Sequence, residues 1–267
     1  MLSILTVNVG AAALTRAGDM LRWLAARPED VYLLTETSKG SGTTYLLDRF
    51  RQAGFAVVHT PDVNGDRGAA LVSRVRVAGR LAGLSDITIP GRVAAAVLAT
   101  EPAVAVLGVY VPSRDRSADK TDKKQAFVAS FLKALDKLPA DTRDRLIMGG
   151  DYNVIARSHR PLHPSFLPFE FGLLEALEAH GLVDAHERCS PGEQPYSWIG
   201  RTGDGYRYDY FHVGRELAEH IQGCAYLHET RELRLTDHAA VTLQLTVDSA
   251  ARLETGDPTA EDALPLF

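Results

Sequence analysis

The sequence predicts a single α/β domain, because strand-like apolar runs and helix-like amphipathic runs alternate along most of its 267 residues. No Gly/Ser-rich linker or internal repeat interrupts this alternation. No G-x-G-x-x-G motif or P-loop follows a predicted strand either, which disfavours a nucleotide-cofactor fold. We therefore expect one domain over residues 1–246, followed by an acidic and disordered tail over 247–267.

The composition, 45% hydrophobic and 24% charged, is that of an ordinary globular protein. No apolar run approaches the ~20 residues that a membrane-spanning helix needs, and the first residues lack the features of a signal peptide. The two cysteines, Cys189 and Cys224, match no zinc-binding spacing. We expect a cytoplasmic monomer that does not contact a membrane.

The first half of the chain is read from its apolar and β-branched runs and its Gly and Pro punctuation. Residues 2–9 form a buried strand, and the helical pattern after it ends before Pro28. A second apolar strand ends abruptly in Thr35-Glu36-Thr37. The expected elements are strands at 2–9, 31–34, 55–59, 68–73, 76–82, 93–99 and 103–111, with helices at 14–26 and 43–53.

The second half contains the clearest helix, residues 122–138, whose apolar side chains recur at steps of three and four. A strand at 145–149 ends in polar residues, and a loop rich in His, Pro and Arg follows at 157–168. The remaining expected elements are a helix at 169–180 and strands at 206–213, 224–228 and 239–246.

Polar residues recur where the apolar strands end. Each one alone is typical of a cap, a turn or a satisfied core group. Together they predict a functional site, because strand-end residues of a packed α/β fold converge on one crevice. The set comprises Asn8, Glu36, Tyr110, Asp151, Asn153, Asp209, Asp237 and His238.

Six short segments carry these residues, and their order along the chain resembles that of the metal-dependent endonuclease/exonuclease/phosphatase superfamily. They are TVNVG (6–10), LTETS (34–38), VYVPSRD (109–115), GGDYNV (149–154), YRYDYFHV (206–213) and LTDHAAV (235–241). The resemblance implies a four-layer α/β sandwich, with two packed mixed β-sheets flanked by helices and an active site at one edge.

Further segments resemble the branch that contains exonuclease III and the abasic-site endonucleases. They are FLPFE (166–170), GLVD (181–184) and YSW (196–198) ahead of GYRYD (205–209). Two positions depart from the pattern of the family, Gly10 in place of an acid and Ser113 in place of an asparagine. Either change could weaken a second metal position or a phosphate contact.

Hydrolysis of a phosphodiester needs charge neutralisation, an activated water and a stabilised leaving group. Glu36 is the candidate for the principal Mg²⁺ ligand, since a hard cation prefers oxygen donors, and Mn²⁺ is a possible substitute. Asn8 and Asp237 complete or orient that shell. Asp151 is the candidate general base.

The remaining strand-end residues have candidate roles around the phosphate. Asn153 positions water or phosphate by its amide, and His238 donates a hydrogen bond to a phosphate oxygen. Asp209 accepts from the other ring nitrogen of His238 and sets its tautomer. Tyr110 contributes a hydrogen bond to the developing negative charge.

Residues outside the strand ends are candidates for binding the substrate. Arg114, which precedes a run of lysines, and Arg157 and Arg160 of the 157–168 loop are interpreted as phosphate contacts, against the alternative of a solvated surface. Aromatic side chains at Trp198, Tyr206 and Tyr208 would line a pocket for a flipped sugar or base, or pack in the core.

The favoured function is a Mg²⁺-dependent phosphodiesterase acting on DNA, as an abasic-site endonuclease, a 3′-exonuclease or both. The alternatives are a phosphatase or phosphodiesterase on a small or lipid substrate, and an inactive scaffold of the same fold. The net charge of −5 gathers in the tail, so it does not argue against DNA. The hydrophobic terminus Leu264–Phe267 resembles a sliding-clamp binding peptide, with Ala263 in place of the usual glutamine. The two interpretations of this terminus are plain disorder and binding to the clamp.

Overall fold

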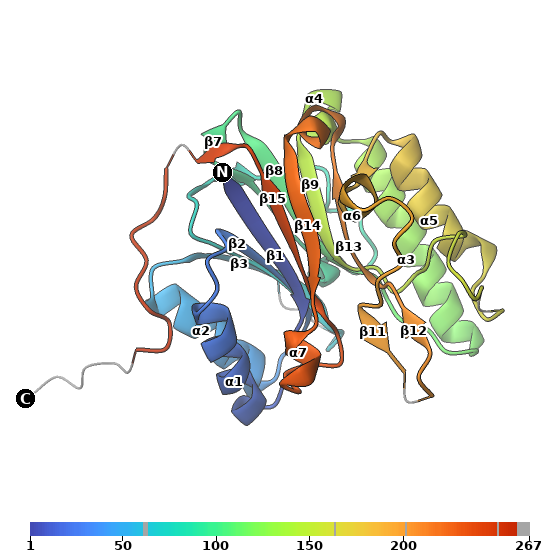
Figure 1. Cartoon of the computed structure of the whole chain (residues 1–267), viewed down its shortest axis with the longest axis horizontal. Coiled ribbons are helices and arrows are strands. Elements are labelled where there is room, and N and C mark those ends of the chain that lie inside the picture. The colour runs from blue at the N-terminus through green and yellow to red at the C-terminus, as the bar shows by residue number, and fades with distance from the viewer. Residues whose placement is uncertain (61–63, 163, 201, 250, 261–267) are drawn as a thin grey trace, which may run out of the picture.

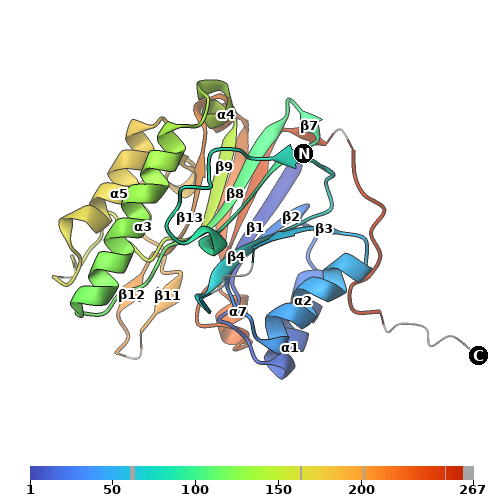
Figure 2. The same ribbon diagram turned by 180° about the vertical axis from the view of Figure 1, so that it is seen from behind.

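The computed structural model describes residues 1–60, 64–162, 164–200, 202–249 and 251–260. Two six-stranded sheets pack face to face, and helices cover their outer faces, which makes four layers (Figures 1 and 2). The expected four-layer α/β sandwich is therefore confirmed. In the described part of the chain, no helix combines the length and the apolar character needed to cross a membrane.

The first sheet has the strand order β14-β15-β1-β2-β4-β3, with β1 parallel to β2 and antiparallel to β15. Helices α1 (Leu14–Ala25) and α2 (Ser41–Gln52) cover its outer face. Its strands are β1 (Leu2–Asn8), β2 (Val31–Thr37), β3 (Ala56–His59), β4 (Gly68–Ser73), β14 (Ile221–Leu227) and β15 (Ala240–Leu245).

The second sheet has the order β10-β13-β9-β8-β6-β5, with β8 and β9 parallel at its centre. Helices α3 (Ala118–Asp136) and α5 (Pro168–Ala179) cover its outer face. Its strands are β5 (Val77–Arg80), β6 (Val93–Leu98), β8 (Val104–Tyr110), β9 (Leu146–Asp151), β10 (Val183–Asp184) and β13 (Asp209–Val213).

The main core lies between the two sheets, and a separate apolar layer lies under each helix pair. Leu33, Val106 and Phe211 belong to the central layer. Because the central strands are covered on both faces, they read as continuous apolar runs rather than as alternating patterns. Burial on both faces also holds the strand ends rigidly, which matters for the side chains placed there.

The expected strand at 206–213 is divided in two. Tyr206 pairs with Trp198 in a separate hairpin, whereas Asp209 pairs with Asp151 of the second sheet. The buried Ser197 Oγ accepts hydrogen bonds from the amides of Tyr208 and Asp209, which fixes the break. The other short elements are η1 (Pro90–Arg92), β7 (Thr100–Glu101), α4 (Ala140–Asp144), α6 (Ala185–Cys189), β11 (Trp198–Ile199), β12 (Gly205–Tyr206), η2 (Arg215–His220), α7 (Glu229–Glu232) and β16 (Asp248–Ser249).

The segment after β15 differs from the expected disordered tail as far as residue 260. Val247 belongs to the central core, and β16 pairs with β7. The following residues lie along the edge of the domain, where Arg252 forms a 2.7 Å ion pair with the buried Asp30. Composition alone missed this docking, because it depends on partners far away in the sequence. The Leu264–Phe267 terminus lies outside the described residues.

Candidate active site

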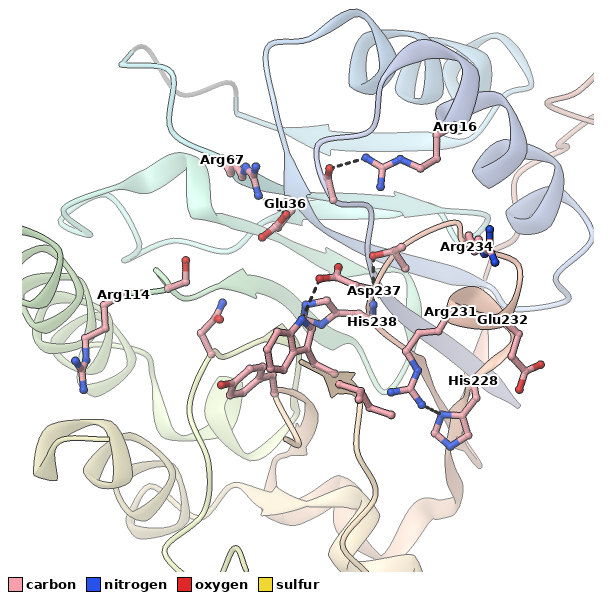
Figure 3. Close-up of a pocket in the computed structure, with 17 residues that line it drawn as sticks. Arg16, Glu36, Arg67, Arg114, His228, Arg231, Glu232, Arg234, Asp237 and His238 are labelled. Atoms are coloured by element: carbon pink, nitrogen blue, oxygen red, sulfur yellow. Dashed lines mark hydrogen bonds and ion pairs between the residues drawn. The ribbon is translucent and has the colours of Figure 1, made fainter. Parts of the chain in front are cut away.

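The strand-end residues meet at one edge of the sandwich, between α7 and the β11–β12 hairpin (Figure 1). A cavity of about 980 Å³ opens there, and Glu36, Asn153, Asp237 and His238 line it (Figure 3). The other four predicted residues are buried and each makes a hydrogen bond to another member of the predicted set: Asn8, Tyr110, Asp151 and Asp209. Both sheets contribute, so packing the two sheets together assembles the site.

Glu36 reaches the cavity through a break in the ladder between β2 and β4. The pairing shifts between Thr35 and Thr37, and Glu36 has a φ of 55°, in the left-handed region. Such a bulge re-aims a side chain at the cost of local strain. The carboxylate accepts a 2.7 Å hydrogen bond from the Tyr110 hydroxyl and forms a 2.5 Å ion pair with Arg67. Tyr110 therefore orients Glu36 in this structure, and its expected hydrogen bond to the developing negative charge stays a prediction.

Asp209, His238 and Asp151 form a buried array. Asp209 Oδ2 lies 2.7 Å from His238 Nδ1, and His238 Nε2 lies 3.9 Å from Asp151 Oδ2. Asn8 Nδ2 donates to Asp151 Oδ2 at 3.0 Å, and the Asn153 amide donates to Asp151 Oδ1 at 2.9 Å. Asn8 thus holds Asp151 in place, and the expected hydrogen bond between Asp209 and His238 is present.

Burial and neighbouring charges shift the pKa values of Asp151 and His238. Burial raises the pKa of Asp151 to about 8, opposed by the charge of His238 and reinforced by the carboxylate of Asp209. Burial alone would lower the pKa of His238, but attraction to Asp209 and Asp151 outweighs it and raises that pKa to about 10. A carboxyl with a raised pKa is a stronger base once ionised, which suits proton transfer near neutral pH.

The β11–β12 hairpin supports the array from one side. Trp198 Nε1 donates to Asp237 Oδ2 at 2.9 Å, and the Trp198 backbone forms a bridge with His238. The carbonyl of Ser197 accepts from the Ala239 amide at 2.6 Å. Ser197 also holds the start of β13 through its hydroxyl. The YSW segment therefore positions both Asp237-His238 and Asp209, a role that sequence reasoning did not assign to Ser197.

Arg114 lines the cavity but is engaged in a buried ionic cluster. Its guanidinium and Lys124 Nζ both lie 2.6 Å from the carboxylate of Glu170. Lys124 Nζ also donates to the carbonyl of Asn153 at 2.7 Å. The position of the Arg114 guanidinium is therefore set mainly by its ion pair with Glu170. This cluster links α3, α5 and the loop after β9, and sequence reasoning assigned no role to Glu170.

Arg157 and Arg160, the expected phosphate contacts of the 157–168 loop, do not line the large cavity. Arg157 pairs with Glu175 at 2.7 Å and lies over the ring of Phe171. Arg160 donates to nearby backbone carbonyls at Arg157 and His159. Both guanidinium groups thus contact their own loop or α5, outside the wall of the cavity.

The three predicted aromatic residues form one cluster, in which Tyr206 stacks on both Trp198 and Tyr208. Trp198, Tyr206 and Tyr208 have ring centroids 5.4–5.8 Å apart. Together with Phe166 they line a second cavity of about 330 Å³, which shares Arg114 and Asn153 with the first. The aromatic group therefore lies directly beside the strand-end array.

Five cationic or imidazole side chains line the large cavity without having been predicted. They are Arg16, Arg67, His228, Arg231 and Arg234 (Figure 3). All belong to loops or to the first or last turns of helices, where no periodic pattern marks a residue that faces a cavity. The only signal in the sequence is the residue type, arginine or histidine, and many surface residues share it.

The donor set of the cavity fits a divalent metal. Glu36 and Asp237 both present carboxylates to it, which are the oxygen ligands that Mg²⁺ prefers. Asp151, Asp209 and His238 also bring ligand atoms within 4.8 Å of one another. The hydrogen bond between Asp209 and His238 engages Nδ1, so the carboxylates of Glu36 and Asp237 are the better metal candidates.

The site at this edge of the fold combines carboxylates and a histidine in a cavity lined by arginines. Together with the fold, it defines the class of protein as a hydrolase of phosphoric esters. The model of the Endonuclease/Exonuclease/phosphatase family matches residues 5–258, and the chain belongs to this family. Enzymes of the family depend on a divalent metal. A search of curated proteins found no match.

Similar solved structures share the fold over nearly the whole chain. A 3′ phosphatase, a NExo variant from Neisseria bound to a product DNA hairpin, is 24% identical, with a TM-score of 0.75 over 92% of this chain and 99% of its own. An AP endonuclease from Archaeoglobus fulgidus is 20% identical, with a TM-score of 0.76 over 92% of this chain and 100% of its own.

Proposed function

We propose that this chain is a Mg²⁺-dependent phosphodiesterase acting on DNA, as an abasic-site endonuclease, a 3′-exonuclease or both. The observation that carries the proposal is the Asp209, His238 and Asp151 array, which lies beside Glu36 in a cavity surrounded by arginines. The similar structures, which are named for a 3′ phosphatase bound to DNA and an AP endonuclease, support DNA as the substrate.

In this proposal the array moves the protons. Asp151, held by Asn8 and the Asn153 amide, takes a proton from the attacking water. Asp209 keeps the proton of His238 on Nδ1, and the Nε2–H of His238 donates to a phosphate oxygen, where negative charge develops. Asn153 Nδ2 donates to the Val111 carbonyl, which fixes the orientation of the amide, and the amide oxygen of Asn153 would orient the water.

Glu36 and Asp237 would hold the metal. When bound, Mg²⁺ neutralises charge on the phosphate and on the leaving oxygen. Tyr110 and Trp198 each donate a hydrogen bond to one of these carboxylates and thereby set its orientation. The pairing of Glu36 with Arg67 balances the carboxylate charge when no metal is bound.

The proposal is tested with purified protein and Mg²⁺ on four substrates in parallel: an abasic duplex, a 3′-recessed duplex, bis(p-nitrophenyl) phosphate and sphingomyelin. We expect nicking of the abasic duplex, shortening of the 3′ end, or both. Turnover of sphingomyelin or the small ester without any cleavage of DNA would overturn the assignment.

Metal dependence is tested on the same substrates. We expect EDTA to abolish turnover and added Mg²⁺ or Mn²⁺ to restore it, because both metal-ligand candidates are oxygen donors. The measurement is the initial rate before and after dialysis against EDTA. Full activity after rigorous chelation would remove the metal from the mechanism.

A further inference from the structure

One wall of the large cavity has no part in the array described above. It is formed by α7 and the turn after it, and we call His228, Arg231 and Arg234 the α7 wall. Figure 3 shows these residues on the side of Asp237 and His238 that faces away from Glu36 and Arg114. The wall therefore extends the cavity beyond the place where the scissile phosphate would lie.

Arg231 is held in place before any ligand binds. Its Nη1 donates to the Tyr196 carbonyl at 3.1 Å, and its Nη2 lies 2.7 Å from His228 Nδ1. An arginine can only donate, so His228 Nδ1 accepts and the ring proton resides on Nε2. Arg231 keeps further N–H groups for a ligand, and His228 Nε2 adds another donor beside them.

Arg234 has no such engagement. No hydrogen bond or ion pair joins its guanidinium to another residue in the part of the chain that the structure describes, and the side chain is exposed. Its backbone has a φ of 56°, in the left-handed region that L-residues rarely adopt and that favours glycine or asparagine. A long cation at such a position, on the wall of a cavity, indicates a binding role.

The wall offers donors for an anion. Two guanidinium groups and one imidazole N–H face the cavity, against the single carboxylate of Glu232. The cavity, at about 980 Å³, lies at the upper end of the ~300–1,000 Å³ range of small-molecule sites and exceeds what one phosphate monoester needs. Guanidinium groups match the oxygens of a phosphate in a bidentate manner.

We propose that the α7 wall binds a second phosphate of the substrate, next to the one that is cleaved. The preferred substrate is then a nucleotide strand with consecutive phosphates, rather than an isolated phosphoester. This inference rests on the proposed function, because it takes the scissile phosphate to lie among Glu36, Asn153 and His238.

The test is binding of fluorescently labelled duplex DNA without divalent metal, so that its outcome does not depend on cleavage. Arg234→Gln should raise the Kd about tenfold or more, as expected for loss of a charge-assisted contact, and lower the log–log salt slope by about one. Glu232→Gln should lower the Kd, since it removes the carboxylate that lines the cavity beside the α7 wall. Arg76→Gln, an exposed arginine far from the cavity, is the matched control and should change neither value.

A methylphosphonate scan locates the contact. One phosphate at a time is neutralised along the strand that carries the cleavage site, and each duplex is titrated with wild type and Arg234→Gln. At one position beside that site, neutralisation should weaken wild type but not the variant. Equal losses for both proteins at every position, or a Kd of Arg234→Gln equal to that of Arg76→Gln, would overturn the inference. Arg231→Gln repeats the test, and its melting temperature shows whether loss of the Tyr196 contact unfolds the wall.

Discussion

Backbone strain among the described residues gathers at the cavity. Glu36, Asn153 and Arg234 line it, and all three are non-glycine residues with φ of 50–56°. Left-handed backbone costs an L-residue about 1–2 kcal/mol, which the packed sheets on either side have to offset. Each of the three side chains is thereby directed to a place that a regular strand or helix end would not reach.

At the same scale, Asp151→Asn should lower kcat by about 10²–10⁴-fold with little change in KM, because an amide cannot accept the proton of the water. The amide also offers only one oxygen to the two donors from Asn8 and Asn153, so we expect a modest loss of thermal stability. Steady-state kinetics and thermal unfolding measure both effects, with the exposed Asp204→Asn as the control. A folded Asp151→Asn enzyme with nearly wild-type kcat would exclude Asp151 as the general base.

His212 makes stability depend on pH. It is fully buried, stacks on Tyr152 and packs against the tilted ring of Tyr210. Burial lowers its pKa from 6.5 to about 4, with Asp184 opposing the shift and Arg207 reinforcing it. Above pH 6.5 the ring is neutral in both states. Below it, the unfolded chain takes up a proton that the folded chain refuses, so the free energy of unfolding falls as the pH drops toward 4.

We therefore expect the free energy of unfolding of the wild type to fall by about 2–3 kcal/mol more than that of His212→Phe between pH 7 and pH 4.5, because only the wild type carries this group. Urea titrations of both proteins at several pH values give the free energy of unfolding against pH. Subtracting one curve from the other removes the contribution of titrating groups that the two proteins share. Parallel stability curves would show that His212 does not carry this linkage.

At the scale of elements, β9 shows why two glycines precede Asp151. A Cβ at Gly149 would lie 2.4 Å from the Phe211 ring, and a Cβ at Gly150, where φ is 145°, would lie 2.0 Å from the Val109 carbonyl. The strand can therefore lie between β8 and β13 and present Asp151 at its end only because these side chains are absent. Packing therefore requires glycine at both positions, and at Gly150 the backbone conformation requires it as well.

Gly149→Ala should accordingly destabilise the protein by about 1–3 kcal/mol through overpacking against Phe211. Gly79→Ala in β5 is the matched control, because a Cβ there meets nothing within 4 Å and should be neutral or slightly stabilising. Chemical denaturation of the two variants compares them. Equal stabilities would mean that the Phe211 ring moves aside freely.

At the scale of the whole molecule, the site exists only where the two sheets meet. Glu36 and Asn8 come from the first sheet, whereas Tyr110, Asp151 and Asp209 come from the second. The hydrogen bonds between Asn8 and Asp151 and between Tyr110 and Glu36 cross from one sheet to the other. Activity therefore requires both halves to fold and pack together.

The segment after Val247 contributes to this packing. Deletion of residues 248–267 should lower the melting temperature by several degrees, since it removes the β16–β7 pairing and leaves the buried Asp30 without Arg252. Deletion of 261–267 alone is the reference, and the difference between the two melting temperatures measures what residues 248–260 contribute. The same value for both truncations would show that the segment adds nothing to the stability of the domain.

The sequence by itself determined the class of fold, most of the element types and the polar residues at the strand ends. Strands that are buried on both faces appear in the sequence as continuous apolar runs, and the residue at which each run stops marks the end of the strand. The same pattern located residues such as Asp151 and His238, and the ordered motifs indicated the family that the whole-chain match confirms.

Only the tertiary structure decided how the remaining side chains are used. In the structure, Arg114 pairs with Glu170, the hydroxyl of Tyr110 donates to Glu36, and Arg234 lines the cavity. These outcomes depend on partners distant in sequence and on left-handed backbone, and neither leaves a periodic trace in the chain. A charged residue in a loop has the same local pattern whether it faces bulk water or a substrate, so only packing distinguishes the two.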